Sequence, residues 1–102
     1  MLMTLAEPAA ASGFTRESSR TMPIDFNAQK LDTIDVHIGR RIRGRRRVLG
    51  LNQSELARRI GVTFQQVHKY ETGQSSVTAA RLYAIAVTLG VTFEYFYDEL
   101  AV

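Results

Sequence analysis

Apolar side chains in residues 34–102 recur at the three-to-four-residue spacing of amphipathic helices. The first such segment predicts a helix that starts near Thr33 or Asp35, either of which could cap it, and that ends at Gly50. One face of this helix carries Ile38, Ile42, Arg46 and Leu49. Because a helix with one apolar face has to bury that face, the segment is expected to pack against the helices that follow.

Four further segments each begin with a residue that can cap a helix N-terminus. The predicted caps are Asn52, Thr63, Thr78 and Thr92, and the first three helices end at Gly61, Gly73 and Gly90. Asn52 and Glu55 also have the spacing of a capping box. No segment shows the sustained period-2 alternation of a strand. The pattern therefore predicts an all-α domain of five helices joined by very short connections.

Residues 1–33 lack sustained periodicity and contain both prolines, Pro8 and Pro23. We interpret them as a mostly disordered, flexible tail in front of a domain at residues 34–102. Met22 begins a Met-Pro-Ile-Asp segment close to that domain. Residues 1–21 are therefore either the product of a start codon assigned too far upstream or a genuine flexible arm. No secretory signal is expected, because residues 1–13 carry no Lys or Arg.

Positive charge is concentrated in the middle of the chain. Residues 34–81 hold ten basic and three acidic side chains, a net of +7, whereas residues 1–33 and 82–102 have net charges of −1 and −3. Such a block is typical of a protein that binds a polyanion, but charge alone leaves a solvated helix face equally open. The chain has no cysteine, which excludes disulfides and thiolate metal sites and is compatible with a reducing cytoplasm. No apolar run approaches the ~18 residues that a membrane span needs.

Residues that could support catalysis or cofactor binding do not form a plausible set. His37 and His68 cannot make a metal site alone, and no clustered carboxylates complete one. The chain shows no Gly-rich phosphate loop, no Ser–His–Asp set and no paired catalytic carboxylates. We therefore expect no enzyme activity, no cofactor, no metal and no small-molecule ligand.

The segment at residues 53–72 has the layout of a helix-turn-helix. Two short helices flank Gly61-Val62-Thr63, where a glycine with positive φ allows a tight turn between crossing helices. Such a pair presents its second helix to the major groove of DNA while the first crosses the backbone. The inward residues of the second helix are predicted to be Val67 and Tyr70.

The stretch from Ile38 to Phe96 resembles the phage-repressor-like, xenobiotic-response-element (XRE) family of bacterial regulators, in a variant common in alpha-proteobacteria. The matching residues are Gly50 to Ala57, Gly61-Val62-Thr63, Tyr70-Glu71-Thr72-Gly73, Ile85-Ala86 and Leu89-Gly90-Val91. Val77 departs from the pattern, since the family often has proline there. The resemblance implies a lambda-repressor-like fold and a sequence-specific transcriptional regulator, expected to be a repressor, that binds double-stranded DNA in the cytoplasm at the nucleoid.

The resemblance also assigns roles to individual residues. It implies base contacts at Phe64, Gln65, Gln66 and Lys69, although without the motif the two glutamines would be read as merely solvated. Backbone contacts are expected at Gln53, Thr63, Ser75 and Ser76, the two serines being equally compatible with ordinary loop residues. Arg46 needs a partner on its apolar face, and the family pairs its position with that of Glu71. Of Arg40, Arg41, Arg43, Arg45 and Arg47, one or two are expected to reach phosphates and the others to be solubilising.

One recognition helix reads few base pairs, so a homodimer on two half-sites is expected. Its interface is predicted in the aromatic C-terminal segment, chiefly at Phe93, Tyr97 and Leu100, because not every apolar residue there can face inward. Two alternatives stay open. One is an antitoxin-like or controller-like DNA binder that also holds a protein partner, and the other is a protein-interaction module that has lost DNA binding.

Overall fold

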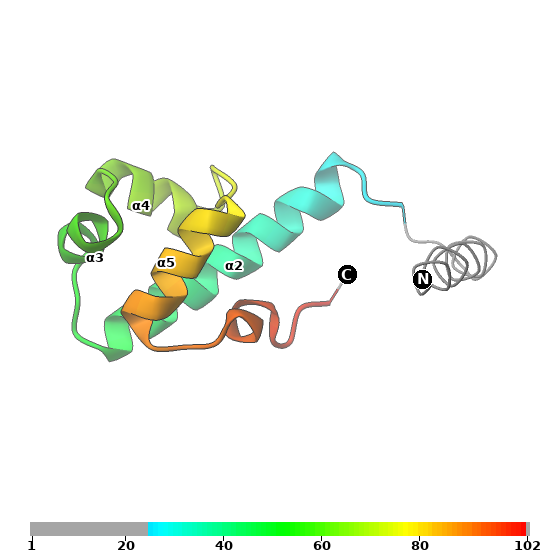
Figure 1. Cartoon of the computed structure of the whole chain (residues 1–102). Helices are drawn as coiled ribbons and strands as arrows, with labels where there is room; N and C mark the ends of the chain where they lie inside the picture. The colour runs from blue at the N-terminus through cyan, green and yellow to red at the C-terminus, as the bar shows by residue number, and fades with distance from the viewer. Residues whose placement is uncertain (1–24, 102) are drawn as a thin grey trace, which may run out of the picture.

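The structure, a computed structural model, describes residues 25–101, which form four α-helices and a terminal 3₁₀ helix (Figure 1). The elements are α2 (Ala28–Val48), α3 (Gln53–Ile60), α4 (Phe64–Thr72), α5 (Ala79–Leu89) and η2 (Phe93–Tyr97). The all-α expectation is confirmed. Residues 1–24, which include most of the expected tail, lie outside the described part.

The first helix begins earlier than the pattern predicted. Its N-cap is Asn27, whose side chain accepts a hydrogen bond from the Lys30 N–H at 2.9 Å, so neither Thr33 nor Asp35 is the cap. Nearly all side chains in the first two turns are exposed, including that of Leu31. A helical segment without a buried face leaves no periodic signal, which is why the sequence pattern missed it.

The fifth element is a 3₁₀ helix rather than an α-helix. Thr92 makes no side-chain capping bond, unlike the four N-caps before it. The carbonyls of Tyr95 and Asp98 instead accept hydrogen bonds from the side chains of Arg41 and His37 on α2, at 2.9 Å and 2.8 Å. These tertiary bonds, together with the buried ring of Phe96, hold the segment in a short, tight form.

The predicted caps of the middle helices are confirmed. Asn52 and Glu55 form a reciprocal capping box at the start of α3. Thr63 and Thr78 accept hydrogen bonds from the backbone N–H groups of the third residues of α4 and α5. Gly61 adopts a left-handed φ of 74°, and this conformation turns the chain from α3 into α4 within three residues.

A single core lies between α2 and the other helices. Its fully buried side chains come from every element and are Phe96, Ile42, Leu56, Ile85, Leu89 and Val67. Leu49, expected on the buried face, is instead the exposed C-cap of α2. Within residues 25–101, no helix is both long and apolar enough to cross a membrane.

Two glycines let α2 and α4 approach closely. A Cβ on Gly39 of α2 would lie 2.3 Å from the Tyr70 carbonyl oxygen and 2.7 Å from the Glu71 carbonyl oxygen. A Cβ on Gly73, just after α4, would lie 2.9 Å from the Cα of Val36. Only glycine fits at these points, so the position of α4 on the domain is fixed by backbone-to-backbone contact.

Two arginines expected to be solubilising or phosphate-binding are used inside the fold. Arg41 donates to the Tyr95 carbonyl and lies 4.0 Å over the Tyr95 ring, while Arg45 donates to the Leu89 carbonyl at 2.9 Å. Together with His37 they bind carbonyls of the C-terminal segment along one side of α2. The arginines of α2 that remain exposed are Arg40, Arg43 and Arg47.

Candidate nucleic-acid interface

Helix α4 is held on the domain by one face and leaves the other open. Val67 and Tyr70 are buried in the core, as predicted, and Glu71 is buried beside them. The turn at Gly61 sets α3 and α4 at an angle to each other at one end of the molecule (Figure 1). This is the geometry in which the second helix of the pair projects from the domain.

The open face of α4 carries the residues expected to read bases. Phe64 is 50% exposed, Gln65 and Lys69 are exposed, and Gln66 is half-buried. Phe64 and Gln65 are the first two residues of the helix, so they lie at its leading end. The structure thus gathers an apolar ring, amide groups and a cation on one exposed face, while their contacts with bases remain a prediction.

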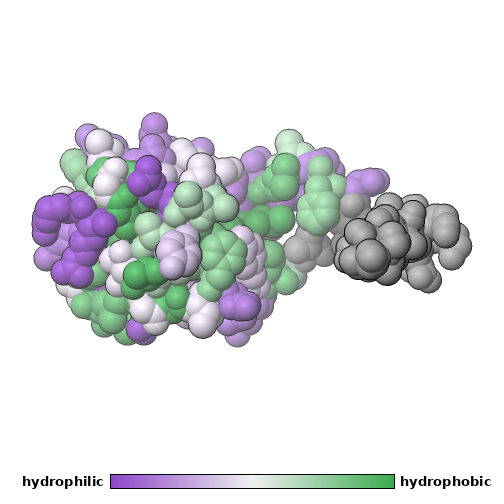
Figure 2. Space-filling model, viewed as in Figure 1, coloured by the Kyte–Doolittle hydropathy of each residue, from purple (hydrophilic) through white to green (hydrophobic). Residues whose placement is uncertain are grey.

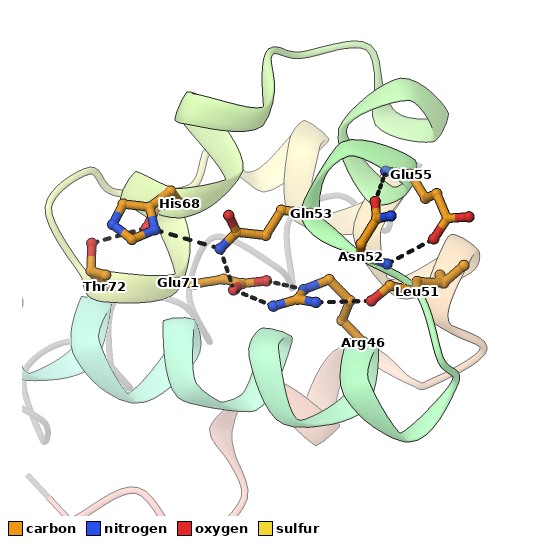
Figure 3. Close-up of polar contacts among 8 residues, drawn as sticks. All are labelled: Arg46, Leu51, Asn52, Gln53, Glu55, His68, Glu71 and Thr72. Carbon is orange, nitrogen blue, oxygen red and sulfur yellow. Dashed lines mark hydrogen bonds and ion pairs between the residues drawn. The ribbon is translucent and has the colours of Figure 1, made fainter.

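Behind this face lies a buried ion pair (Figure 3). Arg46 donates from Nε to Glu71 Oε2 at 2.6 Å and from its second terminal nitrogen to Glu71 Oε1 at 2.9 Å. The side chains are only 10% and 1% exposed. Arg46 also donates to the Leu51 carbonyl at 2.8 Å. The hydrogen bond with Glu71 raises the pKa of Arg46, against the opposing effect of burial. The pair ties α2 to α4.

Gln53 extends the ion pair towards the surface. Its Nε2 donates to Glu71 Oε1 at 3.0 Å and also lies 3.5 Å from His68 Nδ1 (Figure 3). An amide NH₂ can only donate, so in this contact the Nδ1 of His68 accepts. The side-chain nitrogen of Gln53 is therefore committed within the protein. Its backbone N–H and that of Ser54 bond to no other residue in the described part, which leaves two donors at the start of α3.

A depression opens where α2, α3 and α4 meet. Its volume is about 140 Å³, and it is lined by Arg43, Arg46, Gln53, His68, Glu71 and Thr72. The sequence assigned His68 no role beyond showing that it cannot make a metal site with His37. Its position in the sequence, three residues after Gln65, gives no sign that α2 lies opposite. The depression is a tertiary feature that the sequence alone did not reveal.

The other residues expected to contact the DNA backbone differ in how free they are to do so. Thr63 is exposed at the start of α4, with its hydroxyl oxygen accepting the Gln66 N–H at 3.1 Å. The Ser76 hydroxyl donates to the Asp35 carboxylate at 2.5 Å, so it is occupied and lies beside a negative charge. Ser75 is half-buried, and its backbone N–H bonds to the Lys69 carbonyl. The geometry favours Thr63 over Ser76 as a neighbour of phosphate.

An apolar surface lies at the opposite end of the chain. Phe93 and Tyr97 are 41% and 39% exposed, with ring centroids 5.8 Å apart, and Leu100 is half-buried. Tyr83 and Val87, one turn apart on α5, are still more exposed, at 66% and 63%, and were not singled out from the sequence. Figure 2 shows apolar side chains over α5 and η2, in contrast to the hydrophilic surface of α3.

Comparison with known proteins identifies the same unit of the chain. Residues 38–96 match the helix-turn-helix family HTH_3. An uncharacterized transcriptional regulator in the ATPase CF(0) region of Rhodospirillum rubrum is 52% identical over 76 residues, which are 74% of this chain and 70% of that protein. An uncharacterized HTH-type transcriptional regulator of Sinorhizobium medicae (strain WSM419) is 44% identical over 72% of this chain, and the match spans 52% of that protein.

A solved structure with similar architecture is the restriction-modification controller protein C.AhdI from Aeromonas hydrophila. The superposition has a TM-score of 0.58 at 30% identity and covers 60% of this chain and 92% of that one. The likeness therefore takes in almost the whole of the smaller protein.

Proposed function

Since the chain belongs to the HTH_3 (XRE) family of helix-turn-helix transcriptional regulators, which are not enzymes, we propose that it binds a specific double-stranded DNA operator and represses transcription from it. Helix α4 enters the major groove and α3 crosses the backbone beside it. One observation carries this proposal: α4 is fixed to the core by Val67 and Tyr70, while Phe64, Gln65 and Lys69 project from the opposite face.

The chemistry of the projecting side chains suits base edges. A glutamine amide can donate and accept at once, which matches the N6 and N7 groups of adenine. An exposed phenyl ring can contact the methyl group of thymine, and a lysine can donate to guanine. Gln65 is the strongest candidate because it is exposed in the first turn of α4, the end of a recognition helix that contacts base edges.

Backbone contacts have a different source. The free N–H groups at Gln53 and Ser54 lie at the N-terminus of α3, where the helix dipole favours a phosphate. Thr63 lies at the start of α4, and Arg43 adds a cation from α2. Such contacts position a protein on DNA without reading its sequence.

The experiment that tests this assignment compares Gln65→Ala with Gln53→Ala. Each variant is titrated on an operator selected by the wild-type protein and on a scrambled duplex, at matched salt. Gln65→Ala is expected to cost about 1–3 kcal/mol on the operator and to change binding to scrambled DNA little. Gln53→Ala keeps the backbone N–H but removes the side chain that holds Glu71 and His68 beside it, so it is expected to weaken both duplexes evenly. Equal weakening by Gln65→Ala would show that it is not a base reader and would move that role to Phe64 and Lys69.

The protein is further proposed to act as a homodimer on two half-sites about 34 Å apart. The apolar surface formed by Phe93, Tyr97 and Leu100 supports this, because two copies could cover each other's exposed rings. Tyr83 and Val87 on α5 enlarge the apolar area available for such an interface.

The second candidate is a controller-like DNA binder that also holds a protein partner. The likeness to C.AhdI, which covers 92% of that controller protein, favours it specifically. Two measurements separate this candidate from a repressor that acts without a partner. The first is a genome-wide map of binding sites, and the second identifies proteins that copurify only with the DNA-binding form. A copurifying protein would favour the controller-like role. A third candidate is a protein-interaction module that does not bind DNA. Such a module would lack the affinity for duplex DNA, falling steeply with salt, that is expected of a DNA-binding protein.

A further inference from the structure

We propose that the depression between α2, α3 and α4 is the seat of one phosphodiester of the bound duplex, and that His68 is a phosphate contact whose charge makes DNA affinity depend on pH. This inference rests on the proposed function, since it needs a duplex lying on α4. It gives His68 a role of its own, separate from the base contacts proposed for α4 and from the Arg46–Glu71 ion pair.

The shape and position of the depression suit a phosphate. Three helices line it, and two of them bring donors that no side chain uses: Arg43 from α2 and His68 from α4, with Gln53 of α3 between them. His68 follows Phe64 by four residues, so it lies one helical turn, or about 6 Å, behind the leading end of the recognition face. A duplex contacted by Phe64 and Gln65 would therefore bring one strand of its backbone close to the depression.

The electrostatics of the depression favour an anion. The carboxylate of Glu71 forms its floor but is neutralised by two hydrogen bonds from Arg46. Arg43 is exposed at the rim and bonds to no side chain in the described part of the protein. Because the charges of Arg46 and Glu71 cancel, the guanidinium of Arg43 gives the lining one net positive charge even when His68 is neutral.

The hydrogen bond from Gln53 orients the imidazole of His68. Because the Gln53 amide nitrogen occupies Nδ1 as a donor, the neutral ring carries its proton on Nε2. Nε2 bonds to no other group in the described part of the protein, so its N–H can donate to a phosphate oxygen. The groups that line the depression together with His68 are Glu71 and Thr72 on its own helix, Gln53 on α3, and Arg43 and Arg46 on α2. A bound phosphate adds negative charge to this set. In the charged ring Nδ1 becomes a donor, so its contact with the Gln53 amide nitrogen is lost while Nε2–H stays free for the phosphate.

The direction of the pH effect follows. An imidazole gains a positive charge as the pH falls towards 5, and a cationic donor binds a phosphate more strongly than a neutral one. The affinity for DNA is therefore expected to be higher at pH 5.5 than at pH 8.0. At low pH the positive charge on His68 neutralises one more phosphate. The slope of the logarithm of affinity against the logarithm of salt concentration should therefore be steeper at pH 5.5 than at pH 8.0, by about 0.9 per protomer.

The test uses the full chain, a selected operator and a scrambled duplex, titrated over a salt series at pH 8.0 and pH 5.5. At pH 8.0, His68→Ala should weaken both duplexes about tenfold, the loss expected for one hydrogen bond to a charged group. His68→Gln, whose amide nitrogen can lie near the position of Nε2, should restore most of that loss. Both variants should lose the steeper salt dependence at pH 5.5.

His37→Gln is the matched control. His37 bonds through Nε2 to the Asp98 carbonyl, away from α4, so this variant should keep the full response to pH. Loss of affinity for the operator alone in His68→Ala would make His68 a base reader and overturn the phosphate assignment. Unchanged affinity in His68→Ala, or a pH response that survives in His68→Gln, would also overturn it. If the wild-type protein bound neither duplex, the proposed function itself would fail.

Discussion

Two glycines of the same helix should respond in opposite ways to the same substitution. Gly39 and Gly44 both lie within α2, and alanine raises intrinsic helix stability at either position by about 0.5–1 kcal/mol. At Gly44 nothing lies within 4 Å of the added Cβ, so that gain should appear unopposed. At Gly39 the Cβ would meet the Tyr70 carbonyl oxygen at 2.3 Å.

The contact at Gly39 involves backbone atoms of α4, which cannot rotate away. To restore ordinary contact, taken as 3.4 Å or more, α2 and α4 must separate by roughly 1 Å. Overpacking of this kind typically costs about 1–3 kcal/mol, and rigid backbone on both sides places Gly39→Ala at the upper end. With each kcal/mol worth about 4–8 °C in a small domain, the melting temperature should fall by roughly 10 °C.

Thermal unfolding followed by circular dichroism at one protein concentration measures both variants. Gly44→Ala should melt a few degrees above the wild type and bind DNA normally, whereas Gly39→Ala should melt lower and bind the operator more weakly because α4 is displaced. A Gly39→Ala variant as stable as Gly44→Ala would show that α2 and α4 do not meet at this point.

Three further changes test other parts of the structure. Arg46→Met should destabilise the domain by roughly 3–5 kcal/mol in urea unfolding, because it leaves the Glu71 carboxylate buried and unpaired. Adding Glu71→Leu to this variant should recover most of the lost stability. An Arg46→Met variant as stable as the wild type would contradict the buried ion pair. A chain that starts at Met22 should keep the melting temperature and DNA affinity of the full chain, and a large drop in either would give residues 1–21 a structural role. Tyr97→Asp combined with Leu100→Asp should convert a dimer into a monomer in sedimentation and weaken operator binding, and an unchanged oligomeric state would place the interface elsewhere.

Local sequence signals predicted the middle of the domain well. The capping residues Asn52, Thr63 and Thr78 act on backbone groups only three residues away, so their effect does not depend on the rest of the fold. The same holds for Gly61 and Gly73, whose left-handed conformations end α3 and α4. For this reason the helix-turn-helix could be placed from sequence alone.

Features that depend on distant residues could not be predicted in this way. The last element is a 3₁₀ helix whose Tyr95 carbonyl is bound by Arg41, a contact between residues 54 positions apart. Ser76 bonds to Asp35 across 41 positions. The start of α2 at Ala28 was missed for a different reason, since its first turns are solvated and bury no apolar face.

The candidate site also has one part that the sequence predicts and one part that it does not. The exposed residues of α4 follow from helical periodicity once the buried positions Val67 and Tyr70 are known. The depression that holds His68 does not, because its lining comes from three helices. Periodicity predicts which residues of one helix face outward, whereas only the packed structure shows which residues of other helices they meet.

Selection of DNA from a random pool, followed by titration of the wild-type protein, tests sequence-specific binding most directly. The selected operator should bind at least about 10³-fold more tightly than a scrambled duplex at physiological salt, and both affinities should fall steeply as salt rises. Two similar half-sites about 34 Å apart should be recovered in the selected sequences. Failure to enrich any sequence, with equal affinity for every duplex, would contradict the account.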